Sequence, residues 1–128
     1  MRSGWVCAIL TLASCGGPGE AVVVDGVAIS ECLEFDPEEP PREELLLTGQ
    51  DRAIVVAHRA VELNCCHEVE VQARTDEEGT GIDVVYEDKA KEPCDCTCVY
   101  DMGFTLSDLA LGTWQVRVPS QQAEIELN

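Results

Sequence analysis

Five cysteines and one histidine fall into two short clusters whose spacing allows two kinds of sulfur chemistry. The adjacent pair Cys65 and Cys66 is followed directly by His67, and the run CDCTC supplies the second cluster: Cys94, Cys96 and Cys98. Thiolates and imidazole bind zinc or cuprous ion well. In an oxidising compartment the same thiols pair as disulfides. The compartment therefore decides how both clusters are interpreted.

The first fifteen residues carry the signal for that compartment. Arg2 precedes an apolar run at 5–12, and the small residues at 13 and 14 stand immediately before Cys15. The apolar run of about eight residues is far shorter than the roughly twenty that a membrane-spanning helix needs. The pattern resembles instead the lipobox of bacterial lipoproteins.

This resemblance implies an export signal at 1–14 and a lipid anchor on Cys15. Residues 15–20 then form a flexible tether, because Gly and Pro dominate the stretch. Gly16, in a position where aspartate would favour retention, implies the outer membrane. The expected location is the bacterial cell envelope, with the membrane contacted through the lipid, and the remaining residues 21–128 are long enough for one domain.

An exported domain with six cysteines is expected to contain disulfides. Cysteines two apart in an extended strand lie too far apart for an easy bridge, and adjacent cysteines bond only through a strained ring. The economical solution joins the Cys65–Cys66 pair to members of the CDCTC cluster and leaves Cys32 to take the remaining cysteine. The candidates are Cys32, Cys65, Cys66, Cys94, Cys96 and Cys98.

Two alternatives remain open. The first is a metal site, with cuprous ion ahead of zinc, formed by Cys65, Cys66, His67, Cys94, Cys96 and Cys98. The second is a thiol-redox protein, although neither cluster has the C-x-x-C spacing at a helix start that lowers a thiol pKa. With disulfides, no cofactor is expected.

Composition and motifs narrow the functional class. The chain has 25 acidic and 8 basic residues and a net charge of -17, which disfavours nucleic-acid binding because phosphates require clustered cations. No serine lies in a G-x-S-x-G elbow, and the only histidines are His58 and His67. We therefore expect a protein that is not an enzyme.

Alternating apolar and polar residues indicate strands throughout the domain. Residues 61–73 alternate as one long strand or as two strands joined by a bend near the cysteine pair, and the turn residues at 76–81 predict a hairpin. Other expected strands are 21–29, 53–57, 113–118 and 122–128, whereas the acidic, proline-rich stretch 36–44 is expected to be a loop. About seven strands in this length predict an all-β fold, specifically an immunoglobulin-like or fibronectin-like sandwich.

One corner supports that fold. Leu109, Gly112 and Trp114 match the spacing of the leucine, glycine and tyrosine that precede a late strand in such sandwiches. Because tryptophan replaces the tyrosine, the hydrogen bond of this corner would have to come from the indole N–H.

The domain as a whole resembles small, uncharacterised, Cys-rich bacterial lipoproteins. The shared features are a CC pair, the segment CDCTCVYD and a G-x-W/Y-x-V-x-V strand, and they cover residues 54–118. This resemblance implies a lipid-anchored β-sandwich without an assigned chemistry. We expect a disulfide-stabilised module that binds another envelope protein or has a structural role.

Overall fold

The computed structural model describes residues 19–128, which form an all-β fold without helices. The expected export signal and the lipidated Cys15 lie outside the described residues. Within 19–128 nothing forms a helix that could cross a membrane. The strands are β1 (Ala21–Ile29), β2 (Glu44–Gln50), β3 (Ala53–Asn64), β4 (Val69–Thr75), β5 (Gly81–Asp88), β6 (Thr97–Ser107), β7 (Gly112–Val118) and β8 (Gln121–Leu127).

The strands form one hydrogen-bonded sheet in the order β2-β3-β6-β1-β4-β5-β7-β8, in which only β5 and β7 pair in parallel. Strand β1 joins the two halves, since Ala21 and Val22 pair with β4 and the stretch 23–29 pairs with β6. The expected all-β class is confirmed. The described strands number eight rather than about seven, and this continuous pairing differs from the two separate sheets of the expected sandwich.

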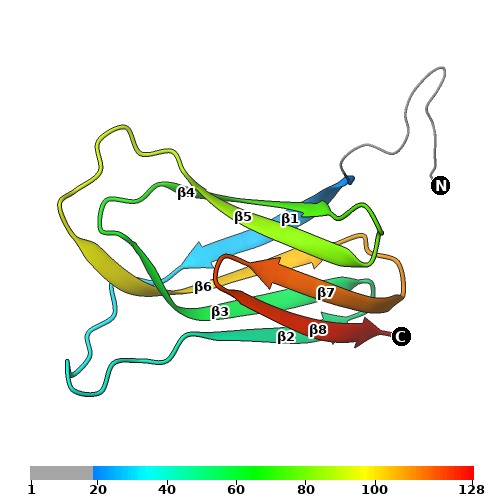
Figure 1. Cartoon of the computed structure of the whole chain (residues 1–128), viewed down its shortest axis with the longest axis horizontal. Coiled ribbons are helices and arrows are strands. Elements are labelled where there is room, and N and C mark those ends of the chain that lie inside the picture. Colours follow the sequence, from blue (N-terminus) through cyan, green and yellow to red (C-terminus); the bar gives the residue numbers. More distant parts are fainter. Residues whose placement is uncertain (1–18) are drawn as a thin grey trace.

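The sheet curls until its two edge strands, β2 and β8, lie side by side (Figure 1). Gly49 in β2 faces β8 so closely that an added Cβ would lie 2.9 Å from a methyl group of Leu127. Near the other end of the same seam, the Ser120 hydroxyl donates a hydrogen bond of 2.6 Å to Glu43. The curl encloses an apolar core that no flat sheet of this length would bury.

Alternating residues of the long strands β3 and β6 supply much of this core. In β6, Tyr100, Met102, Phe104 and Leu106 are buried. In β3 the buried set changes parity at a bulge, where Ala60 has a φ of 58° and its N–H donates to Asp101. Residues before the bulge point inward at even positions and residues after it at odd ones, so the inward face continues toward the cysteine pair.

The predicted local elements are largely confirmed. The stretch 61–73 is two strands, β3 and β4, that meet at a turn on the cysteine pair, and β4 and β5 form the expected hairpin. The Trp114 indole N–H donates to the Ala110 carbonyl at 2.9 Å, as the tryptophan-substituted corner requires. Two strands were not anticipated: β2, next to the acidic loop, and β6, which begins inside the CDCTC run.

Candidate functional site

Strands β3 and β5 finish and β6 begins at the same end of the sheet (Figure 1). Three disulfides join the segments there. They use every cysteine of the described residues: Cys32–Cys98, Cys65–Cys96 and Cys66–Cys94. The Cα–Cα distances of 5.5, 5.7 and 5.4 Å are typical of disulfides. The presence of disulfide bonds is thus confirmed, with the adjacent pair joined to the CDCTC run and Cys32 to the remaining member.

Strand pairing brings the cysteines together. In the β3–β6 ladder Leu63 lies opposite Cys98, and beyond the end of the ladder the Cys65 N–H donates to the Cys96 carbonyl at 3.2 Å. On the other side of β6, the Leu33 N–H donates to the Val99 carbonyl at 2.9 Å. That bond holds the segment after β1 beside β6 and places Cys32 next to Cys98.

The Asn64 side chain holds the Cys66–Cys94 bridge in place, although its residue type and position did not mark it as a site residue. Its carbonyl oxygen accepts the N–H groups of Cys66 and Cys94 at 2.9 and 3.0 Å, and its amide donates to the Cys94 carbonyl at 2.7 Å. Asn64 therefore joins the β3–β4 turn to the loop before β6 through side-chain hydrogen bonds. Its position directly before the CC pair was the only signal in the sequence.

Two of the bridges touch each other through their sulfur atoms. The Cys65 and Cys98 sulfurs, which belong to different disulfides, lie 3.6 Å apart and are half-buried. The other four cysteines are exposed: Cys32, Cys66, Cys94 and Cys96. The cluster thus has a half-buried sulfur contact between two bridges, and its other four cysteine residues are exposed.

Five of the six residues proposed for a metal site are bridged, and among residues 19–128 no group of three or more His, Cys, Asp or Glu side chains could hold a metal ion. A thiolate site would require the disulfides to be reduced first. His67 lies in the turn after Cys66, and its ring packs edge-on against Tyr100 with centroids 4.7 Å apart. Its buried Nδ1 has no hydrogen-bond partner among the described protein atoms. In the oxidised form the histidine is therefore an aromatic packing partner of β6.

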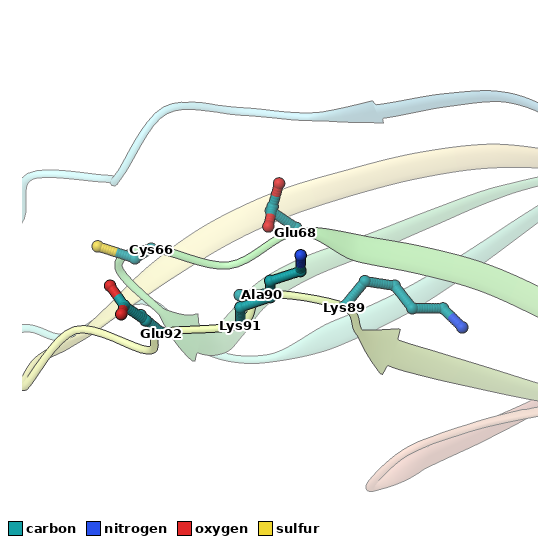
Figure 2. Close-up of a pocket in the computed structure, with 6 residues that line it drawn as sticks. All are labelled: Cys66, Glu68, Lys89, Ala90, Lys91 and Glu92. Atoms are coloured by element: carbon teal, nitrogen blue, oxygen red, sulfur yellow. The ribbon is translucent and has the colours of Figure 1, made fainter.

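An open pocket of about 670 Å³ lies beside the Cys66–Cys94 bridge. Figure 2 shows its lining, which comes from the turn between β3 and β4 and from the loop after β5: Cys66, Glu68, Lys89, Ala90, Lys91 and Glu92. The charged lining comprises two carboxylates and two ammonium groups, the only lysines of the chain. The Lys89 ammonium group is already paired with Glu87, whose carboxylate oxygen lies 2.8 Å away.

Asp88 holds the two walls of this pocket together. Its carboxylate accepts the N–H groups of Ala90 and Glu68 at 2.9 and 3.1 Å. These two hydrogen bonds lower the pKa of Asp88 below its ordinary value because they stabilise the ionised form. The loop after β5 is thereby fastened to the start of β4, next to the disulfides.

A second polar group, inside the curled sheet, was not predicted. His58 is fully buried, with Nδ1 at 2.7 Å from the Tyr86 hydroxyl and Nε2 at 2.7 Å from a Glu43 carboxylate oxygen. That same oxygen accepts the Ser120 hydroxyl. With Glu43 ionised, Nε2 carries the proton and Nδ1 accepts from the phenol, so both ring nitrogens are satisfied.

The electrostatics of this group follow from burial and hydrogen bonding. Burial alone would raise the pKa of Glu43, but the hydrogen bonds from Ser120 and His58 outweigh it and hold the pKa below the ordinary 4.5. Burial raises the pKa of the Tyr86 phenol, and the charge on Glu43 adds to the effect. The group thus links β3, β5, the β7–β8 turn and the residue directly before β2.

Comparison with known proteins gives no relative: no family model, curated protein or solved structure matches the chain. The resemblance to Cys-rich bacterial lipoproteins therefore stays a prediction from the sequence motifs.

Proposed function

We propose that this chain is a lipid-anchored protein of the bacterial cell envelope, whose disulfide-stabilised β domain binds another envelope protein or has a structural role there. The observation that carries the proposal is the pairing of all six cysteines of the described residues into three bridges. Four of these cysteines are exposed, and such bridges persist in oxidising compartments rather than in a reducing cytosol. The lipobox-like sequence ending at Cys15 supplies the route to such a compartment.

The net charge of -17 supports a protein partner over nucleic acid or anionic lipid. An acidic surface repels phosphate backbones and anionic headgroups, so the lipid on Cys15 would provide the membrane attachment alone. Among residues 19–128 we find no arrangement of nucleophile, base and oxyanion donors that would support an enzyme in this proposal. The buried His58 is enclosed by Glu43 and Tyr86 and has no exposed surface for a substrate.

We also propose that the domain is related to immunoglobulin-like sandwiches, with a first strand that belongs to both halves. Support comes from the β1 pairing, which divides the sheet into one group with β6, β3 and β2 and another with β4, β5, β7 and β8. The corner at Leu109 and Trp114, with its indole hydrogen bond to Ala110, supports the same relation.

The test replaces Cys15 with alanine and follows membrane association and thiol state in a bacterial host. The wild-type protein is expected in the membrane fraction, labelled by radioactive palmitate, with no thiol available to alkylation before reduction. Cys15→Ala is expected to lose the label. Recovery of both forms from the cytosol with free thiols would refute the proposal.

A further inference from the structure

We propose that the bridges Cys32–Cys98 and Cys65–Cys96 exchange with each other through the sulfur contact between Cys98 and Cys65. This goes beyond the proposed function, because it gives the cluster an internal thiol–disulfide exchange that starts when a dithiol reduces one bridge. It does not depend on the lipid anchor.

The geometry supplies the two reacting atoms. The Cys98 and Cys65 sulfurs are 3.6 Å apart, which is van der Waals contact, although each is bonded to a different cysteine. Thiol–disulfide exchange requires a thiolate to approach one sulfur of an existing disulfide. A thiolate on Cys98 therefore needs little movement to reach the Cys65–Cys96 bond.

The exposure of the cysteines sets the order of events. Cys32 is exposed, whereas Cys98 is half-buried, so an external dithiol attacks Cys32 and releases Cys98 as a thiolate. The second thiol of the reagent then frees Cys32 and leaves the reagent as its cyclic disulfide. These two electrons reduce the Cys32–Cys98 bridge to two thiols.

The internal step conserves the number of disulfides. The Cys98 thiolate forms a bond to the Cys65 sulfur, the Cys65–Cys96 bond breaks, and Cys96 leaves as a thiolate that takes a proton. The reduced protein then carries a Cys65–Cys98 bridge and thiols on Cys32 and Cys96. Both of these residues are exposed, so the exchange transfers the reactive thiol from the half-buried Cys98 to the surface.

The first experiment uses Cys32→Ser, which leaves Cys98 without its partner. After purification under air, free thiols are blocked with N-ethylmaleimide at low pH and located by non-reducing peptide mapping. The label is expected on both Cys96 and Cys98, in amounts within about tenfold of each other. The two isomers, with Cys65 bonded to Cys96 or to Cys98, each keep one disulfide in the same part of the structure, so their stabilities should be similar. Label on Cys98 alone would overturn the proposal.

The matched control is Cys66→Ser, which leaves Cys94 unpaired in the same cluster. Among residues 19–128, the sulfur contact between two bridges joins Cys65 and Cys98 and does not include Cys94. The label is therefore expected to stay on Cys94. Equal scrambling in both variants would overturn the proposal, because exchange would then be independent of the observed contact.

Limited reduction of the wild-type protein covers the case in which a variant does not fold. Substoichiometric dithiothreitol is followed by acid quench, blocking and mapping of the species with one reduced bridge. A Cys65–Cys98 bridge with label on Cys32 and Cys96 is expected. Molecules labelled at Cys32 and Cys98, with Cys65–Cys96 intact and no Cys65–Cys98 bridge, would contradict the exchange.

Discussion

The polar group around His58 illustrates how single residues stabilise the curled sheet from within. A buried imidazole is costly unless both nitrogens have partners, and here Glu43 and Tyr86 provide them. Because His58 lies in β3, Tyr86 in β5 and Glu43 directly before β2, the hydrogen bonds join three separate segments of the sheet. Ser120 extends the link to the turn between β7 and β8.

The lowered pKa of Glu43 predicts a pH-dependent stability. A carboxyl group whose pKa is lower in the folded than in the unfolded protein stabilises the fold above its unfolded pKa, and this contribution is lost as the pH falls through the folded value. The free energy of unfolding of the wild type, measured in urea, is therefore expected to fall more steeply between about pH 5 and about pH 3 than that of Glu43→Gln. Glu44→Gln, at an exposed neighbouring position, is the control. Equal slopes for the wild type and Glu43→Gln would exclude this role for Glu43.

At the scale of elements, local patterns predicted the β4–β5 hairpin and the strands β7 and β8, but they missed β2 and β6. Strands β4 and β5, like β7 and β8, are adjacent in sequence and alternate clearly, so their pairing follows from turns and periodicity. Strand β6 instead pairs with β3 and β1, which are far away in sequence, and its first residues lie in the CDCTC run. Strand β2 follows a proline-rich loop and contains Gly49, which obscured it.

The cluster was predictable for a different reason. Which cysteines could pair followed from the geometry of strands and disulfides, which needs no knowledge of distant contacts. The contact between the Cys65 and Cys98 sulfurs and the role of Asn64 depend on how the β3–β4 turn meets the loop before β6. These are tertiary contacts, so no local sequence pattern predicts them.

Asn64 provides a test of this alignment between elements. Asn64→Ala loses three hydrogen bonds to Cys66 and Cys94 and is expected to destabilise the protein by about 1 to 3 kcal/mol in urea unfolding. It should also slow formation of the Cys66–Cys94 bridge during oxidative refolding. Asn64→Asp keeps an acceptor for the two N–H groups but sets a carboxylate oxygen against the Cys94 carbonyl, so it should also destabilise the protein. Wild-type refolding kinetics and stability in Asn64→Ala would contradict the assigned role.

At the scale of the whole molecule, the three bridges differ in what they contribute. Their sequence separations are 66, 31 and 28 residues, and each loop alone would stabilise the fold by about 4 kcal/mol in the chain-entropy model. The bridge Cys66–Cys94 lies just inside Cys65–Cys96 and closes almost the same loop, so it adds much less. The Cys32–Cys98 bridge encloses both of these loops, but it also closes the chain between Cys32 and Cys65, which neither of the other bridges does.

A comparison of paired serine variants tests this ranking. Cys32→Ser with Cys98→Ser is expected to lower the melting temperature by about 10 °C or more, because it releases the chain between Cys32 and Cys65, which neither of the other bridges closes. Cys66→Ser with Cys94→Ser should lower it by only a few degrees, at about 1 kcal/mol of lost stability. Circular dichroism melts give both values. A larger loss from the second pair would contradict the entropic ranking.

We propose that the six cysteines of this domain form structural disulfides in the cell envelope. The most direct measurement is non-reducing peptide mapping by mass spectrometry on protein purified from the envelope without reductant, with metal content determined on the same sample. We expect three bridges, Cys32–Cys98, Cys65–Cys96 and Cys66–Cys94, and no stoichiometric copper or zinc. Six free thiols with bound copper or zinc would contradict it.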